Sequence, residues 1–169
     1  MHLTYITGGQ RSGKSIFAEK KAKETSTKPI YIATAEVKDL EMEQRVKAHK
    51  EKRGQELITF EEPLYLESSI ERGMTVLLDC ATLLTTNWLF ECNENPVLAY
   101  EEITNQLNIL FDSGAENIII VSNEVGMGGI APNKLTRDFT DLLGRVNKYI
   151  AEKADEVWLM ISGIPIKIK

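Results

Sequence analysis

Eight consecutive residues in the first part of the sequence have the types and spacing needed to bind a triphosphate. They match G-x-x-x-x-G-K-[ST] and are Gly8, Gly9, Gln10, Arg11, Ser12, Gly13, Lys14 and Ser15. Glycines let backbone N–H groups point inward at phosphate oxygens, and the following helix adds the positive end of its dipole. Lys14 can reach the β- and γ-phosphates, and the Ser15 hydroxyl can ligate Mg²⁺. We predict that this loop binds a nucleoside triphosphate and that Lys14 is catalytic.

A strand-like run that ends in a carboxylate supports this prediction. The run 75–79 (TVLLD) is almost entirely apolar until Asp79, which is the form of the acidic element that holds magnesium beside a phosphate-binding loop. We expect Asp79 to hold Mg²⁺, directly or through water. The alternative is that Asp79 caps the helix that follows, because aspartate is common at that position.

The remaining motifs narrow the class of nucleotide-binding protein. Asn133 and Lys134 begin an N-K-x-D guanine-recognition motif, but Thr136 stands in place of the carboxylate and the segment opens a helix. A motor-type ATPase usually needs a longer chain. These exclusions leave a small phosphoryl- or nucleotidyl-transfer enzyme, in which catalysis depends on positioning and charge neutralisation.

Of the two histidines in the sequence, His49 is the better placed for chemistry, because His2 lies next to the chain terminus. The segment 39–53 predicts a charged helix on which Met42, Val46 and His49 share one face. Nearby basic residues disfavour protonation of the imidazole, which leaves a neutral nucleophile, and they would attract a polyphosphate. The alternative is a histidine on a helix surface beside scattered lysines.

The elements that must position these residues alternate along the chain. We expect strands at 2–7, 30–34, 57–60, 75–79, 117–122 and 157–162, with 164–168 folding back as an antiparallel edge. Apolar stripes with helical spacing run through 100–111 and 135–150. The alternation predicts a three-layer α/β fold with a mostly parallel sheet, which binds ligands beyond the carboxyl ends of its strands. Without linkers or repeats, residues 1–169 are expected to form a single domain.

The composition excludes several classes of protein. The chain has 169 residues and a net charge of −5, which argues against a general nucleic-acid-binding protein. Its two cysteines are too few for a disulfide framework or a closed zinc site. Neither a membrane-spanning apolar run nor a signal-peptide pattern is present in the sequence. We therefore expect a cytoplasmic enzyme that binds neither nucleic acid nor membranes.

Several segments are more specific than the phosphate-binding loop, above all AHKEKR within EMEQRVKAHKEKR and NEVGMG within SNEVGMGGIAP. They occur in order with TGGQRSGKS, YIATAE, TFEEPL, LLDC, TNWLF, GRVNKYIAEKADEVW and SGIPIKIK, nearly from end to end. In these segments the chain resembles the bifunctional adenosylcobinamide kinase/adenosylcobinamide-phosphate guanylyltransferases of cobalamin biosynthesis. The resemblance implies a P-loop NTPase-like fold.

The resemblance also implies two reactions. Adenosylcobinamide is first phosphorylated on the hydroxyl of its aminopropanol arm with ATP or GTP. GTP then forms a guanylyl-histidine and releases pyrophosphate, and the GMP group passes to the phosphorylated corrinoid to give adenosylcobinamide-GDP. The nucleophile implied by the family motif is His49, on a helix that we expect to move during the reaction.

The same resemblance assigns further nucleotide-binding residues. Beside the phosphate-binding loop they are Ala33, Thr34, Ala35, Lys50, Glu51, Lys52, Arg53, Glu61 and Asp79. Relatives often carry Glu where this chain has Asp79, so the partner of this carboxylate is open. The loop that contains Asn123 and Glu124 is implied to form a wall facing substrate or nucleotide.

The resemblance suggests a homotrimer, and side chains near Trp88, Leu89 and Phe90 are expected to be exposed and available for such an interface. Two other functions stay open at this point. One is a P-loop kinase of another small alcohol, in which His49 is incidental. The other is a nucleotide-dependent regulatory binding module that hydrolyses slowly or not at all.

Overall fold

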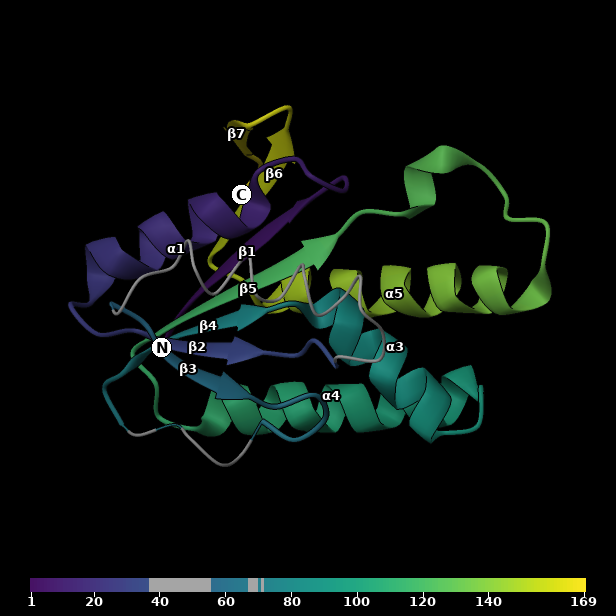
Figure 1. The fold of residues 1–169 in the computed structure, drawn as a ribbon, viewed down its shortest axis with the longest axis horizontal. Helices are drawn as coiled ribbons and strands as arrows, with labels where there is room; N and C mark the ends of the chain where they lie inside the picture. Colours follow the sequence, from purple (N-terminus) through teal and green to yellow (C-terminus); the bar gives the residue numbers. More distant parts are fainter. Residues whose placement is uncertain (37–55, 67–69, 71) are drawn as a thin grey trace.

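A computed structural model describes residues 1–36, 56–66, 70 and 72–169. Within these residues seven strands form one sheet in the order β3-β2-β4-β5-β1-β6-β7 (Figure 1). All neighbouring strands are parallel except β6 and β7. The strands are β1 (His2–Gly8), β2 (Ile30–Ala33), β3 (Ile58–Glu61), β4 (Thr75–Asp79), β5 (Asn117–Asn123), β6 (Glu156–Ile161) and β7 (Ile164–Lys167).

Helices cover both faces of the sheet and make it the middle of three layers (Figure 1). Helix α1 (Lys14–Thr25) lies on one face, where Ala18 and Ala22 pack against Ile6 and Leu77. The other face carries α3 (Ala81–Glu91), α4 (Pro96–Asp112) and α5 (Lys134–Lys153), with the short 3₁₀ helix η1 (Gly126–Gly128) after β5. The expected three-layer α/β fold with an antiparallel last strand is therefore confirmed.

The predicted strands all exist, with ends that move by one residue at most. Strand β2 ends at Ala33, and the hydroxyl of the next residue, Thr34, bonds the backbone of Cys80. Strand β6 ends at Ile161 because Ser162 and Gly163 both have positive φ values, 51° and 85°, and form the tight turn into β7. Both predicted apolar stripes lie on helices, α4 and α5. The helix expected at 39–53 lies outside the described residues.

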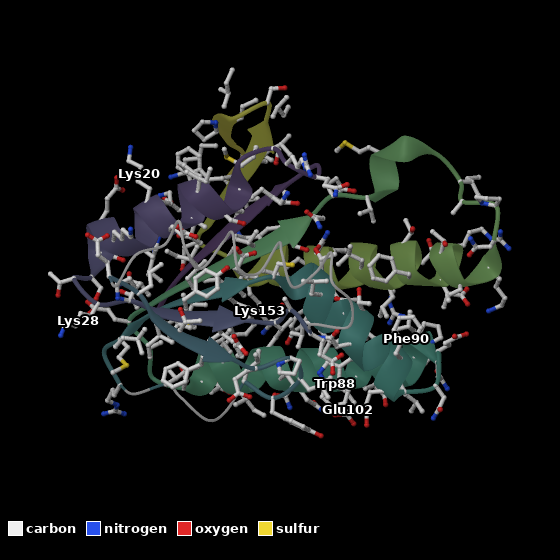
Figure 2. The ribbon with its side chains drawn as sticks, viewed as in Figure 1. Lys20, Lys28, Trp88, Phe90, Glu102 and Lys153 are labelled. Carbon is white, nitrogen blue, oxygen red and sulfur yellow. The ribbon has the colours of Figure 1, made fainter. Side chains whose placement is uncertain are left out.

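The expectation of an exposed apolar surface on α3 is wrong for two of its three residues. Trp88 is 5% exposed and Leu89 is 2% exposed, and both pack in the main core. The Trp88 indole N–H donates to the Leu64 carbonyl at 3.2 Å, which fixes the ring inward. Phe90, on the opposite side of the same helix, is 50% exposed (Figure 2). The helix thus packs Trp88 against the segment that contains Leu64 and presents Phe90 to solvent.

None of the helices in the described part of the chain combines the length and apolar character needed to cross a membrane.

Candidate active site

The phosphate-binding loop leaves the carboxyl end of β1, between β5 and β6. A Cβ atom on Gly8 would lie well inside 3.0 Å of the Met160 carbonyl oxygen, closer than real Cβ atoms come to another atom. Glycine at this position therefore lets β1 run tightly against β6 before the chain turns. Farther along the loop, the Gly163 N–H donates to the Ser12 carbonyl at 3.0 Å. The hairpin of β6 and β7 thus supports the loop from one side.

The amino end of α1 is open toward this loop. Gly13 is the N-cap residue, with a φ of 93°, and it has no side chain that could bond the first N–H groups of the helix. No acidic residue lies in the first turn. Open N–H groups and the positive end of the helix dipole together form an anion-binding position.

The Lys14 ammonium group lies inside the curl of the loop. It donates to the Gly9 carbonyl at 2.6 Å and approaches Ser12 Oγ at 3.5 Å, and the side chain is 7% exposed. Burial lowers the pKa of Lys14, and the nearby Cys80 and Asp79 side chains act in the opposite direction. The charge of Asp79 therefore reaches the lysine, which brings the two predicted phosphate- and metal-binding groups into one site.

Asp79 is held by a tyrosine from the neighbouring strand. The Tyr31 hydroxyl donates to Asp79 Oδ2 at 2.8 Å. Helix α3 begins with Cys80 as its N-cap and has no side-chain capping bond. The alternative reading of Asp79 as a helix cap is therefore wrong, and Asp79 is the last residue of β4, at the sheet edge that carries the phosphate-binding loop.

Three predicted site residues lie in one row across the sheet. Ala33 of β2 is in register with Glu61 of β3 on one side and with Asp79 of β4 on the other. The next residue, Thr34, is fully buried, and its hydroxyl accepts from Cys80 N and donates to Cys80 O, both at 2.8 Å. A nucleotide contact from this segment stays a prediction, and because the Thr34 hydroxyl is engaged it falls to Ala33 and Ala35.

Buried amides and hydroxyls, which the sequence patterns did not single out, fix the ends of two strands. Asn87 of α3 donates to the carbonyls of Thr34 and Pro63, both at 2.9 Å. Asn147 of α5 donates to the Asn123 carbonyl at 3.0 Å. The sequence feature that could have indicated Asn147 is a polar residue on an otherwise apolar helix face, because Asn147 lies beside Val146 among the buried residues of α5.

Comparison with known proteins identifies the family. Residues 4–168 match the family model described as cobinamide kinase / cobinamide phosphate guanyltransferase. The chain belongs to this family. Among its relatives, the bifunctional adenosylcobalamin biosynthesis protein CobU of Escherichia coli is 36% identical and that of Salmonella typhimurium is 38% identical, each over 99% of both chains. The corresponding protein CobP of Pseudomonas aeruginosa is 36% identical over 97% of this chain and 95% of its own.

Membership of the cobinamide kinase / cobinamide phosphate guanyltransferase family confirms the predicted enzyme class, a kinase and guanylyltransferase. The comparison does not reach individual residues, so their roles stay predictions. His49, Lys50, Glu51, Lys52 and Arg53 lie outside the described residues. Asn133 is the N-cap of α5 and accepts from Thr136 N at 2.8 Å, which confirms that the incomplete guanine motif opens a helix.

The two predicted magnesium ligands are the hydroxyl of Ser15 and the carboxylate of Asp79. Ser15 lies in the first turn of α1, directly after Lys14, and Asp79 lies close enough to influence Lys14. In the part of the chain that is described, no group of three or more histidine, cysteine, aspartate or glutamate side chains is arranged to hold a metal. Ser15 and Asp79 fit a cation that also takes oxygens from phosphate and water, as Mg²⁺ does.

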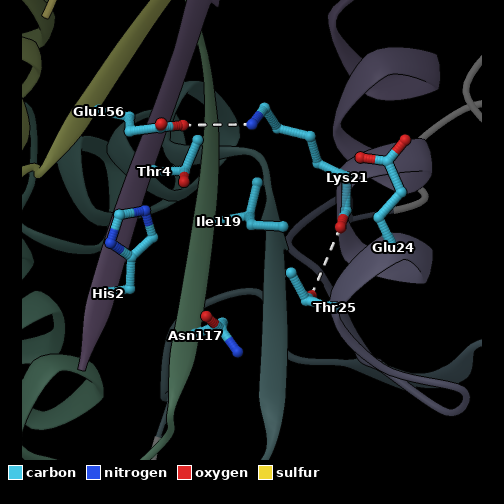
Figure 3. Close-up of a pocket in the computed structure, with 8 residues that line it drawn as sticks. All are labelled: His2, Thr4, Lys21, Glu24, Thr25, Asn117, Ile119 and Glu156. Atoms are coloured by element: carbon cyan, nitrogen blue, oxygen red, sulfur yellow. Dashed lines mark hydrogen bonds and ion pairs between the residues drawn. The ribbon is translucent and has the colours of Figure 1, made fainter.

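A crevice of about 170 Å³ lies at the other edge of the sheet (Figure 3). His2, Asn117 and Glu156, at the amino ends of β1, β5 and β6, line it together with α1 residues such as Lys21. Lys21 and Glu156 pair with each other at 3.2 Å. Because the phosphate-binding loop lies at the carboxyl ends of the same strands, this crevice is not the nucleotide site of the family.

Proposed function

We propose that this protein, as one P-loop domain over residues 1–169, phosphorylates adenosylcobinamide and then converts the product to adenosylcobinamide-GDP. The observation that carries the proposal is a complete phosphate-binding loop, with a buried Lys14 near Asp79, in a chain that matches the family over residues 4–168. The printed names of the relatives, bifunctional adenosylcobalamin biosynthesis proteins, support the same pair of reactions.

In the first reaction, the loop and the amino end of α1 hold the triphosphate of ATP or GTP. Lys14 exchanges its bond to the Gly9 carbonyl for the β- and γ-phosphates. Ser15 and Asp79 would hold Mg²⁺, which neutralises phosphate charge when it is bound. The hydroxyl oxygen of the aminopropanol arm then forms a bond to the γ-phosphorus, and the nucleoside diphosphate leaves.

In the second reaction, the His49 imidazole forms a bond to the α-phosphorus of GTP, and the bond from that phosphorus to the bridging oxygen breaks, which releases pyrophosphate. A phosphate oxygen of the phosphorylated corrinoid then attacks the same phosphorus, and the bond to histidine breaks. Ala33, Ala35, Glu61 and the basic residues beside His49 belong to this nucleotide site in our proposal. The helix that carries His49 moves toward the nucleotide between the two reactions.

A homotrimer is part of the proposal on the ground of the family resemblance alone, and a cytoplasmic location is proposed from the composition of the sequence. Of the side chains first expected to form the interface, Phe90 remains available, since Trp88 and Leu89 belong to the core. Sedimentation equilibrium would measure the number of subunits, and a monomer would contradict this part of the proposal.

The test of the proposed function is the mass of the intact protein after incubation with GTP and Mg²⁺. We expect one added GMP, carrying the α-phosphate label, and a loss of that mass when phosphorylated cobinamide is supplied. Label from α-phosphate that never appears on the protein would exclude the guanylyltransferase. If the same preparation phosphorylated cobinamide, the protein would then be a kinase without guanylyltransferase activity.

A further inference from the structure

Glu124 is placed beside the phosphate-binding loop by the end of the neighbouring strand. The last pair in the register of β1 and β5 joins Gly8 to Asn123. One residue later, the Glu124 N–H donates to the Gly8 carbonyl at 3.0 Å. The backbone of Glu124 therefore lies against the first glycine of the loop, at the sheet edge where the triphosphate is bound.

The residue before Glu124 is fixed on both sides by buried side chains. Asn123 N donates to Thr82 Oγ1 at 2.7 Å, and the Asn123 carbonyl accepts from Asn147 Nδ2 at 3.0 Å. Ser122 joins these two partners, since its hydroxyl lies 3.2 Å from Thr82 Oγ1 and donates to Asn147 Oδ1 at 2.7 Å. Helices α3 and α5 thus hold the strand end from which Glu124 projects.

The carboxylate of Glu124 is oriented by its own loop. Its Oε1 atom accepts from the Gly126 N–H at 2.8 Å. In the described part of the chain, Oε2 accepts no hydrogen bond, so one oxygen is available to another group. Burial raises the pKa of Tyr5 to about 12, and the charge of Glu124 acts in the same direction.

The carboxylates of Glu61 and Asp79, at the same sheet edge, lie on strands farther from β1 than β5 is, and that of Asp79 already accepts a hydrogen bond. Neighbouring strands lie about 4.8 Å apart, so β3, with Glu61, is four spacings or about 19 Å from β1. Asp79 on β4 is two spacings from β1, accepts from Tyr31 and influences Lys14, which suits a magnesium ligand. Glu124 follows β5, one spacing from β1, and its N–H donates to the carbonyl of Gly8, the first glycine of the loop.

We propose that Glu124 is the general base of the kinase reaction, an assignment that rests on the proposed function. The carboxylate takes the proton of the substrate hydroxyl as that oxygen forms its bond to the γ-phosphorus. The bond between the γ-phosphorus and the β–γ bridging oxygen breaks, and its electron pair leaves with the nucleoside diphosphate. Guanylylation of His49 uses a different nucleophile and does not need this proton transfer.

The replacement Glu124→Gln separates this role from a structural one. The glutamine amide oxygen can still accept from Gly126 N, but the amide cannot take a proton at neutral pH. We expect kcat for phosphorylation of cobinamide to fall about 10²- to 10³-fold, with KM changed less than threefold. The fraction of protein that carries GMP after incubation with GTP should equal that of the wild type. Glu116→Gln makes the same chemical change on an exposed residue directly before β5, at the opposite sheet edge, and should leave both reactions unchanged.

Each other result overturns the assignment. A kcat within threefold of the wild type would show that Glu124 takes no proton. Equal losses of phosphorylation and guanylylation would show that Glu124 only supports the loop. Wild-type protein that accepts GMP but phosphorylates no cobinamide would remove the kinase reaction and the base with it, whereas wild-type protein that does neither would refute the proposed function itself.

Discussion

Tyr31 and Asp79 lie on neighbouring parallel strands, and the tyrosine hydroxyl donates to the aspartate carboxylate at 2.8 Å. This bond directs the carboxylate at the end of β4 while leaving its charge intact. Burial lowers the pKa of Lys14 and the charge of Asp79 acts in the opposite direction, so the carboxylate and the lysine influence each other electrostatically.

Replacing Asp79 with Asn should weaken both reactions. The amide oxygen can still accept from Tyr31, but the charge needed by Mg²⁺ is lost, so we expect a fall in rate of about 10²-fold and a higher magnesium requirement. Tyr31→Phe keeps the charge and should cost less than tenfold. Steady-state rates measured across a magnesium titration test the metal-binding role of Asp79. Equal losses of rate in the two variants would contradict it.

Gly8→Ala should destabilise the protein, because the added methyl group would meet the Met160 carbonyl, which belongs to the backbone of β6 and cannot move easily. Overpacking of this kind costs about 1–3 kcal/mol in free energy of unfolding. Gly9→Ala is the matched control, since a Cβ there meets nothing within 4 Å. Gly8→Ala should unfold at a lower urea concentration than Gly9→Ala. Equal midpoints would show that the backbone shifts enough to avoid the contact with Met160.

Lys14→Ala should impair phosphorylation and guanylylation together, since both require the triphosphate to be held. Removing a charged donor from such a site typically lowers the rate by about 10²- to 10³-fold. Lys20→Ala removes a lysine from the exposed side of the same helix and should have little effect. Calorimetry would measure the affinity for nucleotide, and an unchanged affinity in Lys14→Ala would contradict the proposed role of the phosphate-binding loop.

His49→Ala should divide the two activities. Without the imidazole no covalent guanylyl group can form, whereas the proposed kinase reaction does not use His49. We expect no GMP adduct by mass spectrometry and measurable phosphorylation of cobinamide. An adduct that persists in this variant would place the nucleophile elsewhere.

Glu156 should make the free energy of unfolding depend on pH in the acid range. Hydrogen bonds from Lys167 first, then from Trp158 and Lys21, lower its pKa from 4.5 to about 2. Because the folded value lies below the unfolded one, the stabilisation is complete above about pH 4.5 and is lost as the pH falls toward 2. Glu156→Gln should therefore flatten the fall in unfolding free energy over this range. Glu24→Gln, on the exposed side of α1, is the control, and a slope unchanged in Glu156→Gln would contradict the linkage.

Local sequence patterns predicted the strands and helices well, because the spacing of apolar residues differs between a strand and a helix. The run 75–79 matches β4 at both ends, and the stripe through 135–150 lies within α5. The sequence could also place Lys14 in a phosphate-binding loop, since glycine spacing and helix start are local properties. The family resemblance was needed for His49, because helical periodicity alone does not distinguish a nucleophile from a surface histidine.

Long-range contacts could not be predicted in the same way. The burial of Trp88 and Leu89 depends on how α3 meets the segment that contains Leu64, and the TNWLF run gives no sign of it. The bonds of Asn147 to Asn123 and of Thr34 to Cys80 join residues far apart in sequence. Only the strand order brings them together, and that order follows from packing of the whole sheet.

The hydrogen bond from Gly163 to Ser12 has a consequence for the order of events during synthesis. The ribosome makes the glycine-rich loop long before it makes the β6–β7 turn, yet that turn and Met160 bound the loop on one side. Contacts of such sequence separation form late and slowly. A nascent chain that still lacks Gly163 therefore carries the motif without this support, and we expect it to bind nucleotide only after β6 has paired with β1.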